Sequence, residues 1–430
     1  MAGLLFGVLG LLLIIGMPIA VTFGLSVIAV FYAGNHMMLF PALPQRMFTA
    51  IDSFPFMAIP FFILAGNLMG DGGISKRLLD FMQVLLRRRV AALAKITTGT
   101  SLFFGSISGS NPATVAAVGG ITIPAMIKKG YPRDLAGAIA ASSGTVGVIL
   151  PPSIPMVTYA VTANVSVATM FMSGIVPGLM IAMALFLIHG LVCGKYEPAD
   201  QNAPRLSFKE LFTVFKESFL ALLMPILILG GIYGGVFTPT EAAAVSCLYA
   251  FIVSMFIYKE LKMSHLYNVF VKSAKTSAMI LFIISLSGPF TWYMTTQGIP
   301  TQIAEAVLGT FGNRFVILFL MNVILLAIGL FLETQAVILL LTPILLPIAI
   351  NIGMPPVVLG IIIIVNTSIG MTTPPLAVNV FVASAIAKES VEKITYKILP
   401  YLAVSLFVLL LLTYFPIFIT FFPTLLGLRI

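Results

Sequence analysis

Residues that break helices recur in this chain at a constant interval of 223 positions, as in Pro124 and Pro347 (347 minus 124). Glycine and proline dictate the shape of the backbone, so a shared register of these residues indicates two copies of one structural unit. A single matched proline is common by chance, but this register holds for seven pairs without a gap. The pairs are Pro124 and Pro347, Gly130 and Gly353, Pro132 and Pro355, Gly137 and Gly360, Gly147 and Gly370, Pro151 and Pro374, and Pro152 and Pro375.

The composition places both copies in a membrane. Of the 430 residues, 60% are hydrophobic and 9% are charged, and many apolar runs exceed the roughly 18 residues that mark a spanning helix. The formal net charge of +9 comes from short basic clusters beside apolar runs, which is typical of cytoplasmic loops and not of a nucleic-acid partner. We therefore expect an all-α polytopic membrane protein that is surrounded by a lipid bilayer and binds no nucleic acid.

The basic residues fall in different loops of the two copies. Loop 128–133 of the first copy contains three basic residues, whereas the equivalent loop 351–356 is uncharged. Conversely, loop 165–170 is uncharged, and its equivalent, 388–393, contains two lysines. Because basic loops stay on the cytoplasmic side, a loop that is cytoplasmic in one copy is external in the other. The charges predict an inverted-topology repeat, an architecture of secondary transporters.

The first copy begins with a polar stretch, 104–114, between apolar arms at 91–107 and 113–127. Pro112 cannot continue a helix, and a bilayer tolerates broken backbone only where protein or a water-filled cavity satisfies the freed groups. The second arm is shorter than the roughly 20 residues that cross a membrane, and both outer ends are basic. We expect a re-entrant hairpin entered from the cytoplasm. The alternative is two full spans, with the polar tip in the opposite aqueous phase.

The same shift predicts a second hairpin at 315–350, entered from outside, with its tip at 331–334. Each hairpin is followed by an apolar segment that glycines and prolines interrupt, at 144–153 in the first copy and at 366–375 in the second. Discontinuous helices of this kind form the ion and substrate sites of secondary transporters. The predicted fold therefore has two re-entrant helical hairpins and two broken helices.

The rest of the chain predicts helices around these repeats. The run 4–33 reads as a kinked or two-part helix, a single span is expected at 47–69, and 74–89 has the spacing of an amphipathic helix on the cytoplasmic surface. Ser207 and Glu210 stand at capping-box spacing before a phenylalanine-rich helix. The expected divisions are 1–90 (first scaffold helices and the surface helix), 91–171 (first transport repeat), 172–313 (scaffold helices with an interfacial connector at 195–218), 314–391 (second transport repeat) and 392–430 (C-terminal span).

Three motifs resemble the large membrane subunit of TRAP (tripartite ATP-independent periplasmic) transporters. They are Gly-Ser-Asn-Pro-Ala-Thr-Val-Ala-Ala-Val-Gly from Gly109, Thr-Pro-Thr-Glu-Ala-Ala-Ala from Thr238, and Thr-Pro-Ile-Leu-Leu-Pro from Thr342. The resemblance covers essentially the whole chain and includes both broken helices.

This resemblance implies a multi-pass protein of the bacterial cell inner membrane that imports organic acids, such as C4-dicarboxylates or sialic acids, by symport with sodium. It implies an elevator mechanism, in which hairpins and broken helices slide against a static scaffold. It also implies two partners, a small four-helix membrane subunit and a periplasmic substrate-binding protein. No enzyme activity and no organic cofactor are expected, since sodium is the coupling ion.

Sodium is a hard cation that suits oxygen ligands, and unwound backbone directs carbonyl groups at one point. We therefore expect one sodium site in each copy, where the hairpin tip meets the broken helix. Asn111 should be extended because it precedes Pro112, and its amide should bond to the break around Gly147. The expected ligands are Ser108, Asn111, Gly147, Leu150 and Pro152 in the first copy and Thr334, Gly370, Thr373 and Pro375 in the second.

The substrate should lie between the tips, where half-helix N-termini present N–H groups and positive dipole ends to a carboxylate. Glu333 is a carboxylate at membrane depth, so it either couples charge movement or caps the returning half-helix. No arginine or lysine falls clearly within the two tips. The substrate candidates, each of which could instead bond its own helix, are Ser110, Thr145, Ser368, Thr372 and Asn379.

Two other functions remain open on the sequence alone. A stand-alone ion-coupled organic-anion carrier of the same architecture would need no binding protein. A channel or a structural membrane subunit is the second alternative, but a channel needs a continuous polar lining, whereas the polar residues here cluster in two breaks. The sequence contains no Walker loop or Gly-rich nucleotide turn, so ATP-driven transport by this chain has no support.

Overall fold

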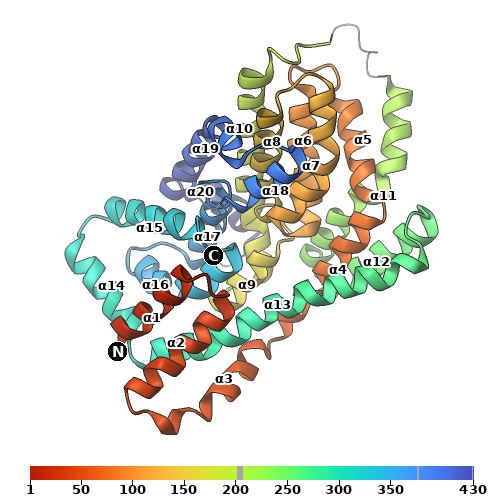
Figure 1. Cartoon of the computed structure of the whole chain (residues 1–430). Helices are drawn as coiled ribbons and strands as arrows, with labels where there is room; N and C mark the ends of the chain where they lie inside the picture. The colour runs from red at the N-terminus through yellow and green to blue at the C-terminus, as the bar shows by residue number, and fades with distance from the viewer. Residues whose placement is uncertain (201–206, 375–376, 429) are drawn as a thin grey trace.

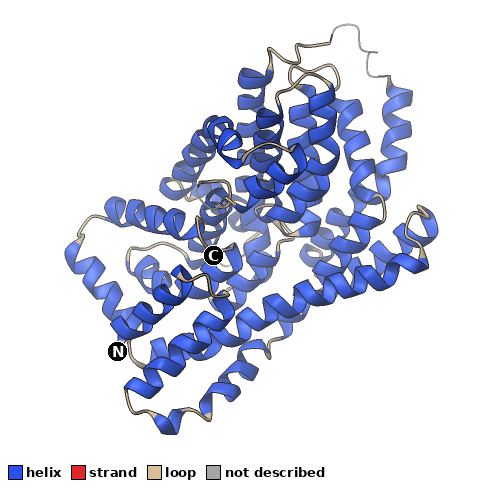
Figure 2. Cartoon of the chain, in the orientation of Figure 1, coloured by secondary structure: helices blue, strands red, loops and turns tan. Residues whose placement is uncertain are grey.

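The computed structural model describes residues 1–200, 207–374, 377–428 and 430, and these residues form helices joined by loops, with no strand among them (Figures 1 and 2). Within the described residues, seven helices are long and apolar enough to cross a membrane. The prediction of an all-α polytopic membrane protein is confirmed.

The first repeat forms a helical hairpin followed by a broken helix, as predicted. The hairpin arms pack against each other, and the 3-10 turn η3 and the cis Pro151–Pro152 peptide bond lie in the break. The elements are α6 (Ala92–Ser108), α7 (Asn111–Lys128), α8 (Arg133–Ser143), η3 (Gly144–Val148) and α9 (Ile154–Thr162).

The second repeat has the same order of elements. Its hairpin and broken helix are formed by α15 (Arg314–Gly329), α16 (Thr334–Asn351), α17 (Pro356–Gly370) and α18 (Val378–Ala387). Two hydrogen bonds show how the repeats are oriented. Arg133 at the start of α8 donates to the carbonyl oxygen of Ala387 at the end of α18, over 3.2 Å. Near the end of α9, the Tyr159 hydroxyl donates to the carbonyl oxygen of Pro356 at the start of α17, over 2.5 Å. Equivalent broken helices are therefore antiparallel, which confirms the inverted topology.

The remaining helices surround the repeats. The longest of them, α13, runs along one side of the molecule and contacts α2, α3, α4 and α16 (Figure 1). The elements are α1 (Ala2–Ile14), α2 (Ile19–Ala33), η1 (Met37–Leu39), α3 (Ala42–Ile51), η2 (Phe54–Met57), α4 (Ala58–Asp71), α5 (Ile74–Leu86), α10 (Val167–Cys193), α11 (Phe208–Tyr233), α12 (Pro239–Ile252), η4 (Val253–Ile257), α13 (Met263–Thr296), α14 (Ile299–Thr310), α19 (Val391–Tyr414) and α20 (Ile417–Leu425).

The helix α10 is tied into the first repeat by a buried polar cluster. The Thr98 hydroxyl of α6 lies 2.7 Å from Ser143 Oγ of α8 and 2.7 Å from His189 Nε2 of α10. All three side chains are almost completely buried, where an unsatisfied polar group is costly. This cluster fixes the hairpin arm, the broken helix and α10 to one another.

The second repeat contains the equivalent cluster, tied to α19. Asn366 Nδ2 of α17 donates to Asn322 Oδ1 of α15 over 2.8 Å, and Asn322 Nδ2 donates to Thr413 Oγ1 of α19 over 3.1 Å. Asn366 lies 223 positions after Ser143 (366 minus 143), and the other two members lie 224 positions after their counterparts. The repeated unit therefore extends beyond 91–171 and 314–391, to α10 and α19.

Two local predictions need correction. The span expected at 47–69 begins later, at Phe54, and runs to Asp71, because α3 ends at Ile51 and Pro55 lies in the 3-10 turn that leads into α4. The capping box at Ser207 does not form, although α11 begins after that residue, and its side chain makes no capping hydrogen bond within the described chain. Glu210 instead binds the Arg87 guanidinium with two contacts of 2.5 and 2.6 Å, so a tertiary ion pair replaces the local cap.

Candidate functional site

The tip of the first hairpin is a two-residue turn between α6 and α7. Gly109 takes a left-handed conformation, with a φ of 58°, and Ser110 is extended, with φ and ψ of −141° and 126°. The Ser110 side chain accepts from the backbone N–H of Ala113 over 3.4 Å and so caps α7. The prediction of extended backbone at Asn111 is wrong. Asn111 is instead the first residue of α7. Pro112 is tolerated in the first turn of the helix, because the N–H that proline lacks would have no helical partner there.

The tip of the second hairpin leads into α16 at Glu333. This residue occupies the capping position, yet its side chain makes no capping hydrogen bond to the described residues. Glu333 is exposed and lines a cavity. Glu333 therefore does not cap α16 through a side-chain hydrogen bond, and it contributes a carboxylate to the lining of the cavity.

Glycines let the broken helices approach the hairpins closely. A Cβ atom at Gly147 would lie 2.6 Å from Thr114 Oγ1 and 3.2 Å from the Ser110 carbonyl oxygen, and one at Gly105 would lie 2.3 Å from the Gly147 Cα. In the second repeat, a Cβ at Gly370 would lie 2.8 Å from the carbonyl carbon of Gly329. Each break therefore lies directly against its own hairpin, as the predicted sodium sites require.

A chain of hydrogen bonds crosses from the first repeat to the second. Asn111 Nδ2 donates to Ser368 Oγ over 2.7 Å, and Ser368 Oγ donates to the Thr145 carbonyl oxygen over 2.6 Å. The Met371 sulfur accepts from Asn111 at 3.6 Å and from Thr334 at 3.7 Å. The amide of Asn111 therefore contacts the opposite repeat, and the prediction that it bonds the break around Gly147 is wrong. Its Oδ1 atom has no protein partner among the described residues.

The structure places the predicted site residues in several different surroundings. Ser108, Ser110, Asn111, Glu333 and Thr334 line the cavity described below. Gly147 and Gly370 lie against the hairpins, whereas Leu150 packs against Gly178 of α10. Five polar candidates are not part of the described cavity lining, and their side chains bond backbone groups of their own repeat or of the other repeat. They are Thr145, Ser368, Thr372, Thr373 and Asn379. Pro152 is buried in the first break, and Pro375 lies outside the described residues.

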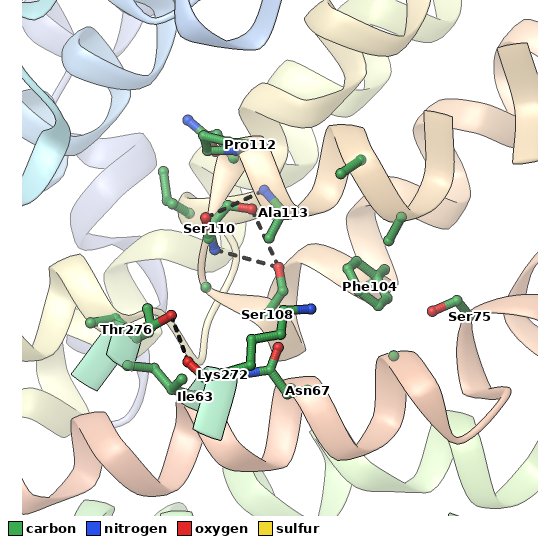
Figure 3. Close-up of a pocket in the computed structure, with 18 of the residues that line it drawn as sticks. Ile63, Asn67, Ser75, Phe104, Ser108, Ser110, Pro112, Ala113, Lys272 and Thr276 are labelled. Carbon is green, nitrogen blue, oxygen red and sulfur yellow. Dashed lines mark hydrogen bonds between the residues drawn. The ribbon is translucent and has the colours of Figure 1, made fainter. Parts of the chain in front are cut away.

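A cavity of about 650 Å³ separates the two tips from the helices α4, α5 and α13 (Figure 3). On the side formed by the two repeats, the cavity is lined by the N-terminal residues of α7 and α16. The opposite wall contributes polar residues that the sequence reasoning missed, namely Asn67, Lys272 and Thr276. Lys272 and Asn67 each interrupt an apolar helix, which is the one local signal that could have identified them.

The wall opposite the tips is held together by its own hydrogen bond. Asn67 Nδ2 of α4 donates to Ser273 Oγ of α13 over 2.9 Å. Gln335, beside Glu333 on α16, also lines the cavity, and its buried Oε1 atom has no hydrogen-bond partner within the described structure. The cavity thus offers two helix N-termini, two lysines (Lys76 and Lys272), two carboxylates (Asp71 and Glu333) and unpartnered amide oxygens to a ligand.

A family model described as "Tripartite ATP-independent periplasmic transporter, DctM component" matches residues 6–418. The chain belongs to this family. The DctM relatives are transporter permeases, and this chain, like them, is a multi-pass protein of the bacterial inner membrane.

Curated DctM relatives match nearly the whole chain. The C4-dicarboxylate TRAP transporter large permease protein DctM of Rhodobacter capsulatus is 37% identical, over 99% of each chain. The sialic acid TRAP transporter large permease protein SiaM of Vibrio cholerae is 35% identical, also over 99% of each. The isethionate TRAP transporter permease protein DctMQ of Oleidesulfovibrio alaskensis is 44% identical over 97% of this chain, which spans 66% of that protein's length.

A solved structure has the same fold at low sequence identity. The YdaH transporter of Alcanivorax borkumensis matches with a TM-score of 0.64 and 15% identity, over 90% of this chain and 89% of YdaH. This likeness concerns the arrangement of the helices.

Proposed function

We propose that this chain is the translocating subunit of a sodium-coupled TRAP transporter that imports an organic anion. The observation that supports this most directly is the cavity between the two hairpin tips and the helices α4, α5 and α13. The N-termini of α7 and α16 both border it, and each directs the positive end of a helix dipole toward it. Such an arrangement favours a carboxylate or a sulfonate.

The substrate class follows from this chemistry and from the relatives. C4-dicarboxylates and sialic acids carry carboxylates, and isethionate carries a sulfonate. These are the compounds named for the three relatives. A cavity of about 650 Å³ is large enough for each of them. We propose a small organic acid of this kind.

Sodium coupling is supported by the contacts between tips and breaks. Gly147 brings the first break to the carbonyl oxygen of Ser110, and the Oδ1 atom of Asn111 is buried without a described protein partner. Oxygen atoms held in this way suit a hard cation. In this proposal the sodium ions hold each hairpin tip against its own break, and the substrate binds between the tips.

The elevator mechanism is supported by the division of the chain into two joined repeats and a separate group of helices. The two repeats are joined by the hydrogen bonds from Asn111 through Ser368 to Thr145, whereas the cavity separates their tips from α4, α5 and α13. The cavity reaches the start of α5, where Arg77 pairs with Glu260 over 2.7 Å, beside the basic turn that precedes α13. Basic turns mark the cytoplasmic side, so this arrangement corresponds to an inward-facing carrier.

The partners follow from the family. The large subunit would act with a small four-helix membrane subunit and with a periplasmic binding protein that delivers the organic acid. No organic cofactor is included in the proposal, because an ion gradient alone drives the movement.

Reconstitution tests the proposal. Both membrane subunits would be placed in liposomes, with the binding protein outside, and uptake of labelled succinate, isethionate and N-acetylneuraminate would be measured under an inward sodium gradient. We expect uptake of one of these acids that depends on all three components. Uptake by the large subunit alone would instead establish the stand-alone carrier, and single-channel conductance would establish a channel.

A further inference from the structure

Lys272 lies on the face of α13 that forms one wall of the cavity. Four residues of α13 line the cavity, Lys272, Thr276, Met279 and Ile280, and their spacing places them on one side of the helix. Figure 3 shows Lys272 facing the first tip, where Ser108 and Ser110 lie. Lys275 is also exposed, but it is not part of the described lining.

The backbone that carries Lys272 is fixed in place. The next residue, Ser273, accepts the hydrogen bond from Asn67 of α4, and Thr276 Oγ1 donates to the Lys272 carbonyl oxygen over 3.1 Å. The lysine therefore belongs to the wall formed by α4 and α13, whereas the tips belong to the repeats. Any contact between Lys272 and a ligand held by the tips depends on the relative position of these two parts.

The Lys272 ammonium group has no carboxylate partner of its own. The salt bridges among the described residues join Arg77 to Glu260, Arg87 to Glu210 and Lys393 to Glu389, and none includes Lys272. Lys76, the other lysine of the cavity, also forms none of these pairs, but it lies on α5 and not on α13. Lys272 is thus a cavity cation without an ion-pair partner among the described residues, and it lies beside Ser108 and Ser110 of the first tip.

From this geometry we infer that Lys272 binds the acid group of the transported anion while the carrier faces the cytoplasm. The inference rests on the proposed function and deepens it, because it names the cation that the two tips lack. The tips contribute the positive dipole ends of α7 and α16, and Lys272 contributes a full positive charge from the opposite wall. Because the lysine does not move with the repeats, the contact is made in this arrangement and is lost when the repeats move toward the other side.

A sided transport experiment tests this inference in the complete complex. Wild type, Lys272→Gln, Lys272→Arg and Lys275→Gln would be reconstituted with the small subunit and the binding protein. Among succinate, isethionate and N-acetylneuraminate, the labelled acid that wild type carries fastest serves as the probe. Half-saturating concentrations would be measured separately on the cytoplasmic side, by exchange, and on the external side, by uptake.

We expect Lys272→Gln to raise the half-saturating concentration on the cytoplasmic side about tenfold, which corresponds to about 1.4 kcal/mol. The external value should not change, Lys272→Arg should stay close to wild type, and the control Lys275→Gln should match wild type on both sides. An unchanged cytoplasmic value for Lys272→Gln, or an equal rise on both sides, would overturn the inference.

Thiol labelling gives a second readout that does not need transport. In a Lys272→Cys variant without Cys193 and Cys247, a membrane-impermeant thiol reagent should react from the cytoplasmic side, and saturating probe acid should slow the reaction. Labelling that the acid does not slow contradicts the role of Lys272 while leaving the proposed function standing. Failure of wild type to carry any of the three acids overturns the proposed function and this inference together.

Discussion

Ser368 donates a hydrogen bond of 2.6 Å to the carbonyl oxygen of Thr145, the residue at the equivalent position of the first repeat. The two residues are separated by 223 positions, the same interval that relates the prolines and glycines of the two copies. The two breaks are therefore in contact through residues at equivalent positions of the two repeats. A movement of one break requires the other to follow, because both atoms are buried and each would lose its partner.

Replacement of sodium tests the coupling ion. We expect uptake to stop when choline replaces sodium while a proton gradient is kept, because the oxygen atoms at the two tip–break contacts would lack their cation. The measurement is the initial rate of uptake by the reconstituted complex. Undiminished uptake in choline would exclude sodium coupling and would make Glu333 the first residue to examine for proton coupling.

The variant Asn111→Ala tests the first sodium site. It removes the donor to Ser368 and the unpartnered Oδ1 atom, and an unpaired buried group costs about 1–3 kcal/mol. If this cost falls on the ion-bound state, half-maximal uptake should need about tenfold to a hundredfold more sodium. Thermal stability would be measured on the same purified protein. A lower melting temperature with an unchanged sodium requirement would assign Asn111 to the fold alone.

The variant Gly105→Ala tests the close packing of the first hairpin against its break. The added methyl group would lie 2.3 Å from the Gly147 Cα, so the backbone must shift, and overpacking of this kind costs about 1–3 kcal/mol. We expect a lower melting temperature of the purified protein and reduced uptake. Gly120→Ala is the matched control, since nothing lies within 4 Å of a Cβ there. Equal stability of the two variants would show that the contact between Gly105 and Gly147 is not tight.

Accessibility of equivalent loops tests the inverted topology in the membrane. Lys128 and Asn351 are equivalent, and both are exposed. In a chain without Cys193 and Cys247, Lys128→Cys should react with an impermeant thiol reagent only from the cytoplasmic side, and Asn351→Cys only from outside. Reaction of both variants from one side would contradict the orientation that the basic loops predict.

The sequence by itself determined the membrane class, the repeat, its inversion and the positions of the breaks. Each of these depends on a property that residues carry wherever they pack. Pro112 and Gly109 restrict or permit backbone shape locally, and the lysines at 128–129 fix the side of their loop through their charge. For this reason the hairpins and broken helices were predicted within a few residues of their observed bounds.

Only the tertiary structure decided which side chains meet. Asn111 was expected to bond the break of its own repeat, but packing of the two repeats brings Ser368 to it instead. Glu210 has the spacing of a local cap, yet Arg87 lies within reach and takes its carboxylate. Lys272 lies 161 positions from Asn111 in the sequence (272 minus 111), and both line one cavity because α13 packs beside the hairpin tips. A side chain bonds the partner that the whole fold places next to it, and no local pattern specifies that partner.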